Sequence, residues 1–127
     1  MNLEKVIFGF FIVLALTLNF GFVYGEIDEP HHHPAWELFA AIVVNLIATG
    51  IKLGDRSQVG AILVATSLVA DLQLIAAALV WTLAVHVTQT GMQPSTMASI
   101  VSLAAGAVVA NVVSVVMLVM DTMMLRR

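Results

Sequence analysis

A single carboxyl group stands inside the longest apolar stretch of this chain. Asp71 is the only acidic residue between Val59 and Val87, and it lies near the middle of that stretch. A charged side chain near the centre of a bilayer is costly, so such residues usually face protein or water and mark ion or proton routes. The chemistry open to Asp71 is therefore proton binding or coordination of a cation.

Other polar side chains share the face or the depth of Asp71. A helix turns about 100° per residue, which places Ser67, Asp71 and Thr82 on one face. Asn45 and Asn111 fall near the middle of two further apolar stretches. We therefore expect Asp71 and both asparagines to form a mid-membrane polar layer, with Ser67 and Thr82 lining an ion path. The alternative is a structural hydrogen-bond cluster that joins the helices, with Asp71 in its neutral form.

A second group of titratable side chains is centred on one short loop. Residues 25–34 (GEIDEPHHHP) combine consecutive histidines with acids. Imidazole and carboxylate together suit zinc, copper or nickel, and imidazole titrates near pH 6.5. The open alternatives are a metal site, a pH sensor and a solvated loop without either role. The candidate residues are His31, His32, His33, His86, Glu26, Asp28, Glu29 and Glu37.

Four apolar stretches must position these groups. They cover residues 6–24, 36–53, 59–87 and 96–123. A helix needs about 20 apolar residues to cross a bilayer. The chain is 61% hydrophobic and 10% charged, whereas a soluble domain carries about 25% charged residues. We therefore predict an all-α polytopic membrane protein, a single domain over residues 1–127 with four transmembrane helices.

The basic residues predict the orientation. With four spans, the 5 Lys and Arg residues all fall on the side of the two termini and the Lys52–Arg56 turn. Cytoplasmic loops carry an excess of Lys and Arg, so we expect both termini in the cytoplasm and the loop 25–35 outside. The alternative is a three-span protein whose first stretch is a cleaved signal segment; it leaves the same turn inside.

The fourth stretch carries small residues at a spacing that lets helix backbones approach closely. These residues are Ser99, Ser102, Gly106, Ala110 and Ser114. The third stretch has polar groups on two faces, Asp71 on one and Gln73 on the other, so it requires neighbours on both sides. We therefore expect a homo-oligomer embedded in membrane lipid.

Composition and missing motifs argue against several classes of protein. A net charge of −3 with 5 basic residues argues against a nucleic-acid partner. No phosphate-binding glycine loop, G-x-S-x-G elbow or H-E-x-x-H motif occurs. We therefore expect no enzymatic activity and no cofactor beyond a bound cation. The fourth stretch has no arginine ladder, and no TVGYG-like filter occurs, which argues against a voltage sensor and a conventional potassium pore.

Three segments carry a family resemblance. MNLEKVIFGFF, ELFAAIVVNLIAT and TSLVADLQLIAAALVW resemble an uncharacterised family of small four-helix proteobacterial inner-membrane proteins. The resemblance covers about residues 1–82 and does not include the fourth stretch. It implies a bacterial inner membrane and, through a loose association of that family with potassium-channel genes, a channel-related role. It supplies no site residues.

Three functional hypotheses follow. The first is a small homo-oligomeric cation channel or proton-coupled ion transporter with Asp71 as its central group. The second is a non-conducting accessory subunit of a larger membrane-protein partner such as a channel. The third is a metal or pH sensor on the outer face, built on the histidine-rich loop.

Overall fold

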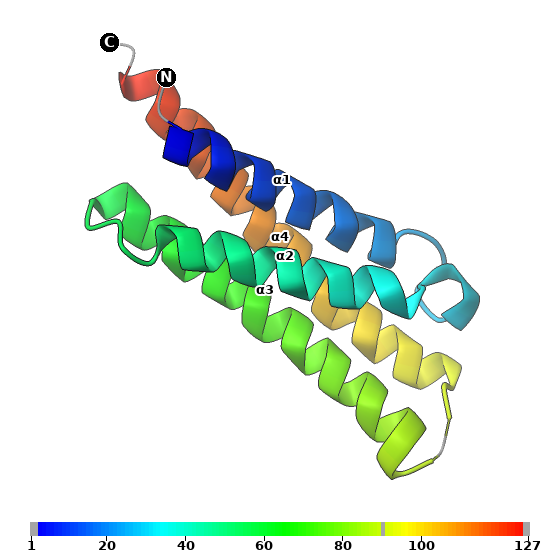
Figure 1. Cartoon of the computed structure of the whole chain (residues 1–127). Helices are drawn as coiled ribbons and strands as arrows, with labels where there is room; N and C mark the ends of the chain where they lie inside the picture. Colours follow the sequence, from blue (N-terminus) through cyan, green and yellow to red (C-terminus); the bar gives the residue numbers. More distant parts are fainter. Residues whose placement is uncertain (1–2, 90, 126–127) are drawn as a thin grey trace.

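The chain folds into four long helices (Figure 1). The structure is a computed structural model that describes residues 3–89 and 91–125. The long helices are α1 (Leu3–Val23), α2 (Ala35–Lys52), α3 (Gln58–Thr82) and α4 (Pro94–Leu125). A 3-10 turn, η1 (Pro30–His32), lies between α1 and α2, and a π-helical turn, η2 (Leu83–Val87), continues α3. The all-α prediction is confirmed, and 4 helices are long and apolar enough to span a membrane.

The helices form a bundle in which each one packs against two neighbours. α1 and α3 both contact α2 and α4. Two ion pairs join elements at one end: Lys5 Nζ lies 2.9 Å from Asp121 Oδ2, and Lys52 Nζ lies 3.4 Å from Glu4 Oε1. The start of α1, the end of α4 and the α2–α3 turn are therefore neighbours. We call this the basic end, defined by Lys5, Lys52 and Arg56.

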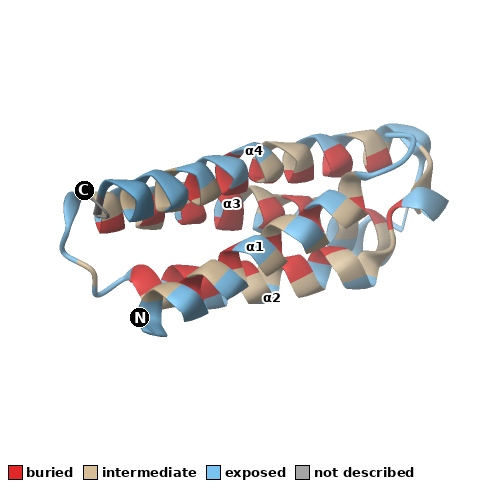
Figure 2. Ribbon diagram, turned by 90° about the horizontal axis from the view of Figure 1, so that it is seen from above, coloured by how far each residue is buried: buried red, intermediate tan, exposed pale blue. Residues whose placement is uncertain are grey.

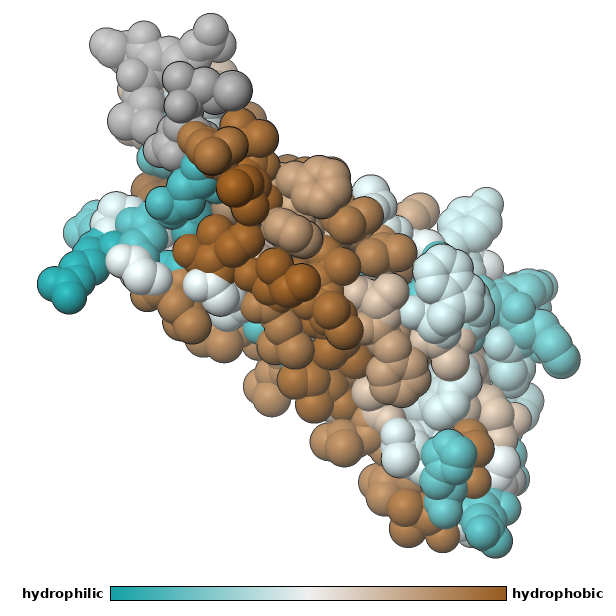
Figure 3. Space-filling view, in the orientation of Figure 1, coloured by the Kyte–Doolittle hydropathy of each residue, from teal (hydrophilic) through white to brown (hydrophobic). Residues whose placement is uncertain are grey.

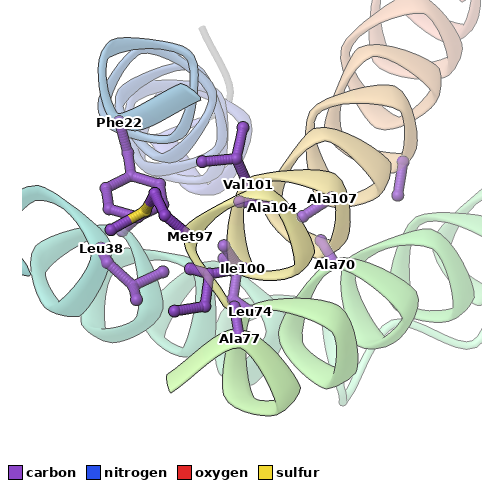
Figure 4. Close-up of a cluster of buried hydrophobic side chains, with 12 residues drawn as sticks. Phe22, Leu38, Ala70, Leu74, Ala77, Met97, Ile100, Val101, Ala104 and Ala107 are labelled. Atoms are coloured by element: carbon purple, nitrogen blue, oxygen red, sulfur yellow. The ribbon is translucent and has the colours of Figure 1, made fainter. Parts of the chain in front are cut away.

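Buried side chains face inward on every helix, and exposed ones face outward (Figure 2). One core cluster, near the histidine-rich loop, contains Phe22, Leu38, Leu74, Met97 and Ile100 together with several alanines (Figure 4). A smaller cluster of Phe8, Ile12, Ala48 and Leu63 fills the bundle on the side of the basic end. Alanine at many inward positions lets the helices approach one another closely.

The outward faces are apolar, unlike those of a water-soluble bundle. Leu72, Phe10 and Val109 are 71%, 62% and 64% exposed, and brown apolar surface covers the middle of the molecule (Figure 3). A soluble helix carries charged residues on its outer face. These apolar faces match what a lipid environment requires.

The regular α-helix of α3 ends at Thr82, five residues before the predicted stretch does. Thr88 N donates to Leu83 O at 2.8 Å, which closes a wider π-type turn. Gln89 and Gly91 then adopt positive φ values of 57° and 77°, and this conformation reverses the chain into α4. Glycine reaches it at little steric cost.

The α3–α4 contact uses only part of the predicted small-residue stripe. Ala110 and Ser114 are buried, and the Gln73 amide lies directly against Gly106, where a side chain would collide with it. Ser99 and Ser102 are exposed. Residues four apart differ by about 40° in direction, so the stripe rotates away from the interior toward the start of α4. Ser99 and Ser102 therefore do not pack against a helix of the same chain, and a helix-packing role for these two residues stays a prediction.

Removing the interhelical hydroxyl of Ser114 should weaken the bundle. Thr66 Oγ1 and Ser114 Oγ lie 2.5 Å apart, and Thr66 also donates to Ile62 O, so Ser114 is the donor to Thr66. We expect Ser114→Ala to lower the free energy of unfolding in detergent by about 0.5–2 kcal/mol. Ser102 is an exposed serine on the same helix, so Ser102→Ala is the matched control and should change the free energy of unfolding little. Equal effects of the two variants would contradict this assignment.

Candidate functional site in the bundle core

Asp71 lies inside its own four-helix bundle, at the contact between α2 and α3. It is 4% exposed. Asn45 Nδ2 donates to Asp71 Oδ1 at 2.5 Å, and Thr49 Oγ1 lies 2.7 Å from Asp71 Oδ2. Asn45 and Thr49 are four residues apart on α2, so they project from the same face. Both oxygens of one carboxyl group are thus held by one neighbouring helix.

The α2–α3 turn sets the register that brings these groups level. Ser57 caps α3, since its Oγ accepts from Gly60 N at 2.9 Å. Asp55 Oδ1 in turn accepts from Ser57 N at 2.9 Å and from Ser57 Oγ at 2.8 Å. These two bonds hold the pKa of Asp55 below its usual value. The Asp55 carboxyl lies so close to Gly60 that a side chain there would collide with it.

The hydrogen bonds around Asp71 can form whether or not the carboxyl carries a proton. Asn45 Nδ2 has two hydrogens, which serve Ser67 O at 3.2 Å and Asp71 Oδ1. The hydroxyl of Thr49 has one hydrogen but faces two acceptors, Asn45 O at 3.0 Å and Asp71 Oδ2. If Asp71 is neutral, its Oδ2–H donates to Thr49 and Thr49 donates to Asn45 O. If Asp71 is ionised, Thr49 donates to Asp71 Oδ2 instead. Every hydrogen has an acceptor in both forms, so the geometry is compatible with the gain and loss of a proton.

Further polar atoms in the same core have no hydrogen-bond partner among the described residues. They are Asn45 Oδ1, Ser67 Oγ and both amide atoms of Asn111. Asn45, Ser67 and Asn111 are all 0% exposed. A buried polar group left unpaired costs about 1–3 kcal/mol, and such groups usually mark water or ion sites. The core therefore offers donors and acceptors beyond those that hold the helices together.

The structure brings some of the predicted layer together and leaves one residue outside it. Asn45, Ser67 and Asp71 are joined by hydrogen bonds, and Asn111 is buried on α4. Thr82 is exposed, so it does not lie in the interior of this bundle, and its place along an ion path stays a prediction. α2 and α3 are antiparallel and lie level at Asn45 and Asp71. Thr82 is eleven residues after Asp71, and the residue of the other helix at the same height is eleven residues before Asn45. That residue is Pro34, which precedes the first residue of α2, so α2 does not cover Thr82.

Sequence reasoning missed two buried polar residues, Thr49 and Asn19. Thr49 lies one turn beyond Asn45, and that spacing is the signal that could have found it. Asn19 is 0% exposed on α1. With its amide oriented to match the backbone it faces, Asn19 donates to Ala104 O at 3.0 Å and accepts from Val108 N at 3.1 Å. This residue bonds α1 to the backbone of α4.

His33 is the buried member of the histidine-rich loop. It is 0% exposed. Its Nδ1 lies 2.5 Å from Phe22 O, and its Nε2 lies 2.6 Å from Glu26 O. Both partners are acceptors, so only a doubly protonated ring donates to both. Phe22 lies in the last turn of α1, where carbonyls lack helical partners and the helix dipole favours a cation.

The other two histidines of the loop form local hydrogen bonds, and the rest of the candidate residues do not gather around them. His32 Nδ1 accepts from Glu26 N at 2.9 Å, and His31 Nδ1 lies 2.8 Å from Glu29 Oε1. The side chain and backbone N–H of His31 lower the pKa of Glu29. Asp28 and His86 are exposed, and the Glu37 carboxyl packs against Gly21. Among the described residues, no three His, Cys, Asp or Glu side chains group as a metal site.

The fold and the site define a small all-helical protein with four helices suited to a membrane and a carboxyl group buried between two of them. The chain belongs to a family of unknown function (DUF6394), which matches residues 32–122. The match covers α2, α3 and α4, so it includes the fourth helix that the sequence resemblance left out, and it omits α1. No curated protein and no solved structure matches the chain.

The Asp55 carboxyl offers a test of the turn that sets the register. We expect Ser57→Ala to raise the pKa of Asp55 toward its usual value, because the hydroxyl donor is lost. Since the pKa of Asp55 is depressed in the folded protein, the ionised carboxyl group stabilises the fold at pH values above the usual pKa of Asp. This stabilisation is lost as the pH falls through the pKa that Asp55 has in the folded state. NMR titration of the Asp55 carboxyl carbon measures this, with Glu29 as an internal reference. An unchanged Asp55 titration would show that the hydroxyl is not a donor.

The ring of His33 offers a second test. We expect ¹⁵N NMR of the folded protein to show at least one ring nitrogen whose hydrogen is bonded to a carbonyl oxygen, since both ring nitrogens face one. His33→Ala should lower the free energy of unfolding by about 1–3 kcal/mol, because buried carbonyls lose their donor. His31→Ala is the control, since its side chain is 94% exposed. Equal losses of stability in the two variants would contradict this role of His33.

Proposed function

We propose that this protein moves protons or proton-coupled cations across a bacterial inner membrane, with Asp71 as the group that binds the proton. The observation that carries the proposal is the hydrogen-bond set of Asp71, which accommodates both forms of the carboxyl: Thr49 can donate to Asn45 O beside the neutral acid and to Asp71 Oδ2 beside the ionised one. A carboxyl group at this depth is a functional candidate because its charge is costly in lipid.

Proton exchange needs partners beside the carboxyl group. Asn45 Oδ1 and Ser67 Oγ have no described partner, and Asn45 and Ser67 O are already bonded to each other next to Asp71. Water molecules that bridge such groups hold their places at a cost of about 0–2 kcal/mol each. These atoms support a short hydrated relay next to Asp71, with Asn111 as a further polar group on α4.

The basic end supports the orientation in the proposal. Lys5, Lys52 and Arg56 all belong to it, and Arg126 and Arg127 follow α4 outside the described residues. By the excess of Lys and Arg in cytoplasmic segments, both termini lie in the cytoplasm and the histidine-rich loop lies outside. The protein so placed is a non-enzymatic, multi-pass protein that assembles with copies of itself.

A second function, an accessory subunit of a larger membrane protein, is favoured by one other observation. A hollow of about 460 Å³ lies between α3 and α4 on their outer side, and Thr66, Gln73, Gly106 and Val109 contribute to its lining. Gln73 has no hydrogen bond to any described residue. An amide in an apolar groove suits a polar contact with a helix of another chain, which in membranes contributes about 0.6 kcal/mol on average.

The test of the proposed function is ion flux in liposomes that hold purified protein, measured under H⁺, Na⁺ and K⁺ gradients. Asp71→Asn keeps the shape of the side chain, and its amide can donate to Thr49 as the neutral acid does, but it cannot exchange a proton. We expect flux to fall at least tenfold while the melting temperature stays close to that of the wild type. Asp121→Asn, a carboxyl at the basic end, is the control and should retain flux.

Two outcomes would overturn this proposal. Flux that persists in Asp71→Asn would exclude Asp71 as the proton-binding group. A folded wild type that conducts no ion would favour the accessory function, and affinity purification from membranes should then recover a larger partner that is lost when Gln73 is replaced by leucine.

A further inference from the structure

A cavity of about 520 Å³ opens at the basic end, between the start of α1 and the α2–α3 turn. Its charged lining residues are Glu4, Lys5, Lys52, Asp55 and Arg56. Figure 3 shows hydrophilic surface over the α2–α3 turn, directly beside the apolar surface of the helices. The cavity therefore lies at the level where lipid headgroups would meet this bundle.

The ammonium group of Lys52 is buried but loosely held. Its side chain is 4% exposed, and Nζ lies 3.4 Å from Glu4 Oε1 and 3.5 Å from Asp55 Oδ2. Bonds between an ammonium and a carboxylate normally measure about 2.7–2.9 Å. The ring of Phe8 lies 4.9 Å from Nζ and adds a cation–π contact. A desolvated ammonium with only long ionic contacts retains capacity for a closer anion.

Arg56 provides the second cation for such an anion. It is exposed at the α2–α3 turn and forms no hydrogen bond or ion pair with any described residue. The planar fork of an arginine matches two oxygens of a phosphate group. Lys5 is already paired with Asp121, and the carboxyl groups of Glu4 and Asp55 both face Lys52. Arg56 is therefore the cation of the lining that no described carboxylate neutralises.

We propose that this cavity binds the phosphodiester of a phospholipid headgroup. Lys52 Nζ and the guanidinium of Arg56 donate to the phosphate oxygens, which gives the Arg56 guanidinium an anionic partner. A lipid is the source rather than free phosphate, because Leu3 and Leu53, which adjoin the lining residues in the chain, are both 65% exposed and offer apolar surface for acyl chains. Basic pockets between helices at the cytoplasmic face are suited to such headgroups.

The experiment compares three additives on delipidated protein in detergent. They are a short-chain phosphatidylglycerol, the matching diacylglycerol without phosphate, and inorganic phosphate. A ligand that binds only the folded state raises its stability in proportion to the logarithm of concentration over Kd. We expect only the phosphatidylglycerol to raise the melting temperature, with the rise increasing with its concentration.

Two variants connect the effect to the cavity. Arg56→Gln alters an exposed side chain, so it should fold normally and weaken lipid binding at least fivefold. Lys52→Met should abolish lipid binding. If the Lys52→Met variant does not fold, the lipid binding of Arg56→Gln alone tests the proposal. Glu37→Gln, which changes a charge at the opposite end of α2, is the control and should bind as the wild type does. Equal stabilisation by diacylglycerol or by inorganic phosphate, or unchanged binding in Arg56→Gln, would overturn the proposal.

Discussion

The contact of Asp71 with Asn45 and Thr49 is the interaction on which the centre of this bundle depends. It places a carboxyl group between two helices whose outer faces are apolar, and it bonds both carboxyl oxygens to α2. A charge at that position costs more than the small net gain of an ordinary hydrogen bond. The bundle tolerates the group because the α2–α3 turn aligns two donors with it, so the turn and the core site form one structural unit.

The sequence predicted the fold well because the dominant signal is composition. Four apolar stretches with turn residues between them permit one class of architecture, and basic residues mark one end of it. The depth of Asn45 and Asp71 also followed from counting residues away from the α2–α3 turn. These inferences need only helix periodicity and chain length, which tertiary packing does not change.

The sequence could not predict which face of each helix is covered. Thr82 shares a face with Asp71, yet it lies beyond the start of α2 and is exposed. Ser99 and Ser102 belong to a regular small-residue pattern, but Met97 and Ile100 occupy the inner face of α4 instead. Asn19 was missed for the converse reason, since an isolated polar residue in an apolar helix reveals its partner only when the neighbouring helix is placed. Thr49 shares a helix face with Asn45, but its contact with Asp71 likewise depends on how α2 and α3 are aligned.

The basic and imidazole groups at the two ends of the bundle lie away from the core carboxyl. The C-terminal end of α1 receives His33, whose ring contacts Phe22 O, and the C-terminal end of α2 carries Lys52. Both groups lie where a helix dipole favours positive charge. That effect falls off within one turn, so neither helix end compensates a charge at Asp71, and no described Lys, Arg or His bonds to it. The donors that do reach Asp71 are an amide and a hydroxyl, both neutral. Whatever charge Asp71 carries is therefore met within the bundle by these two neutral groups of α2 alone, so the α2–α3 contact is the part of the fold most sensitive to a change at this carboxyl.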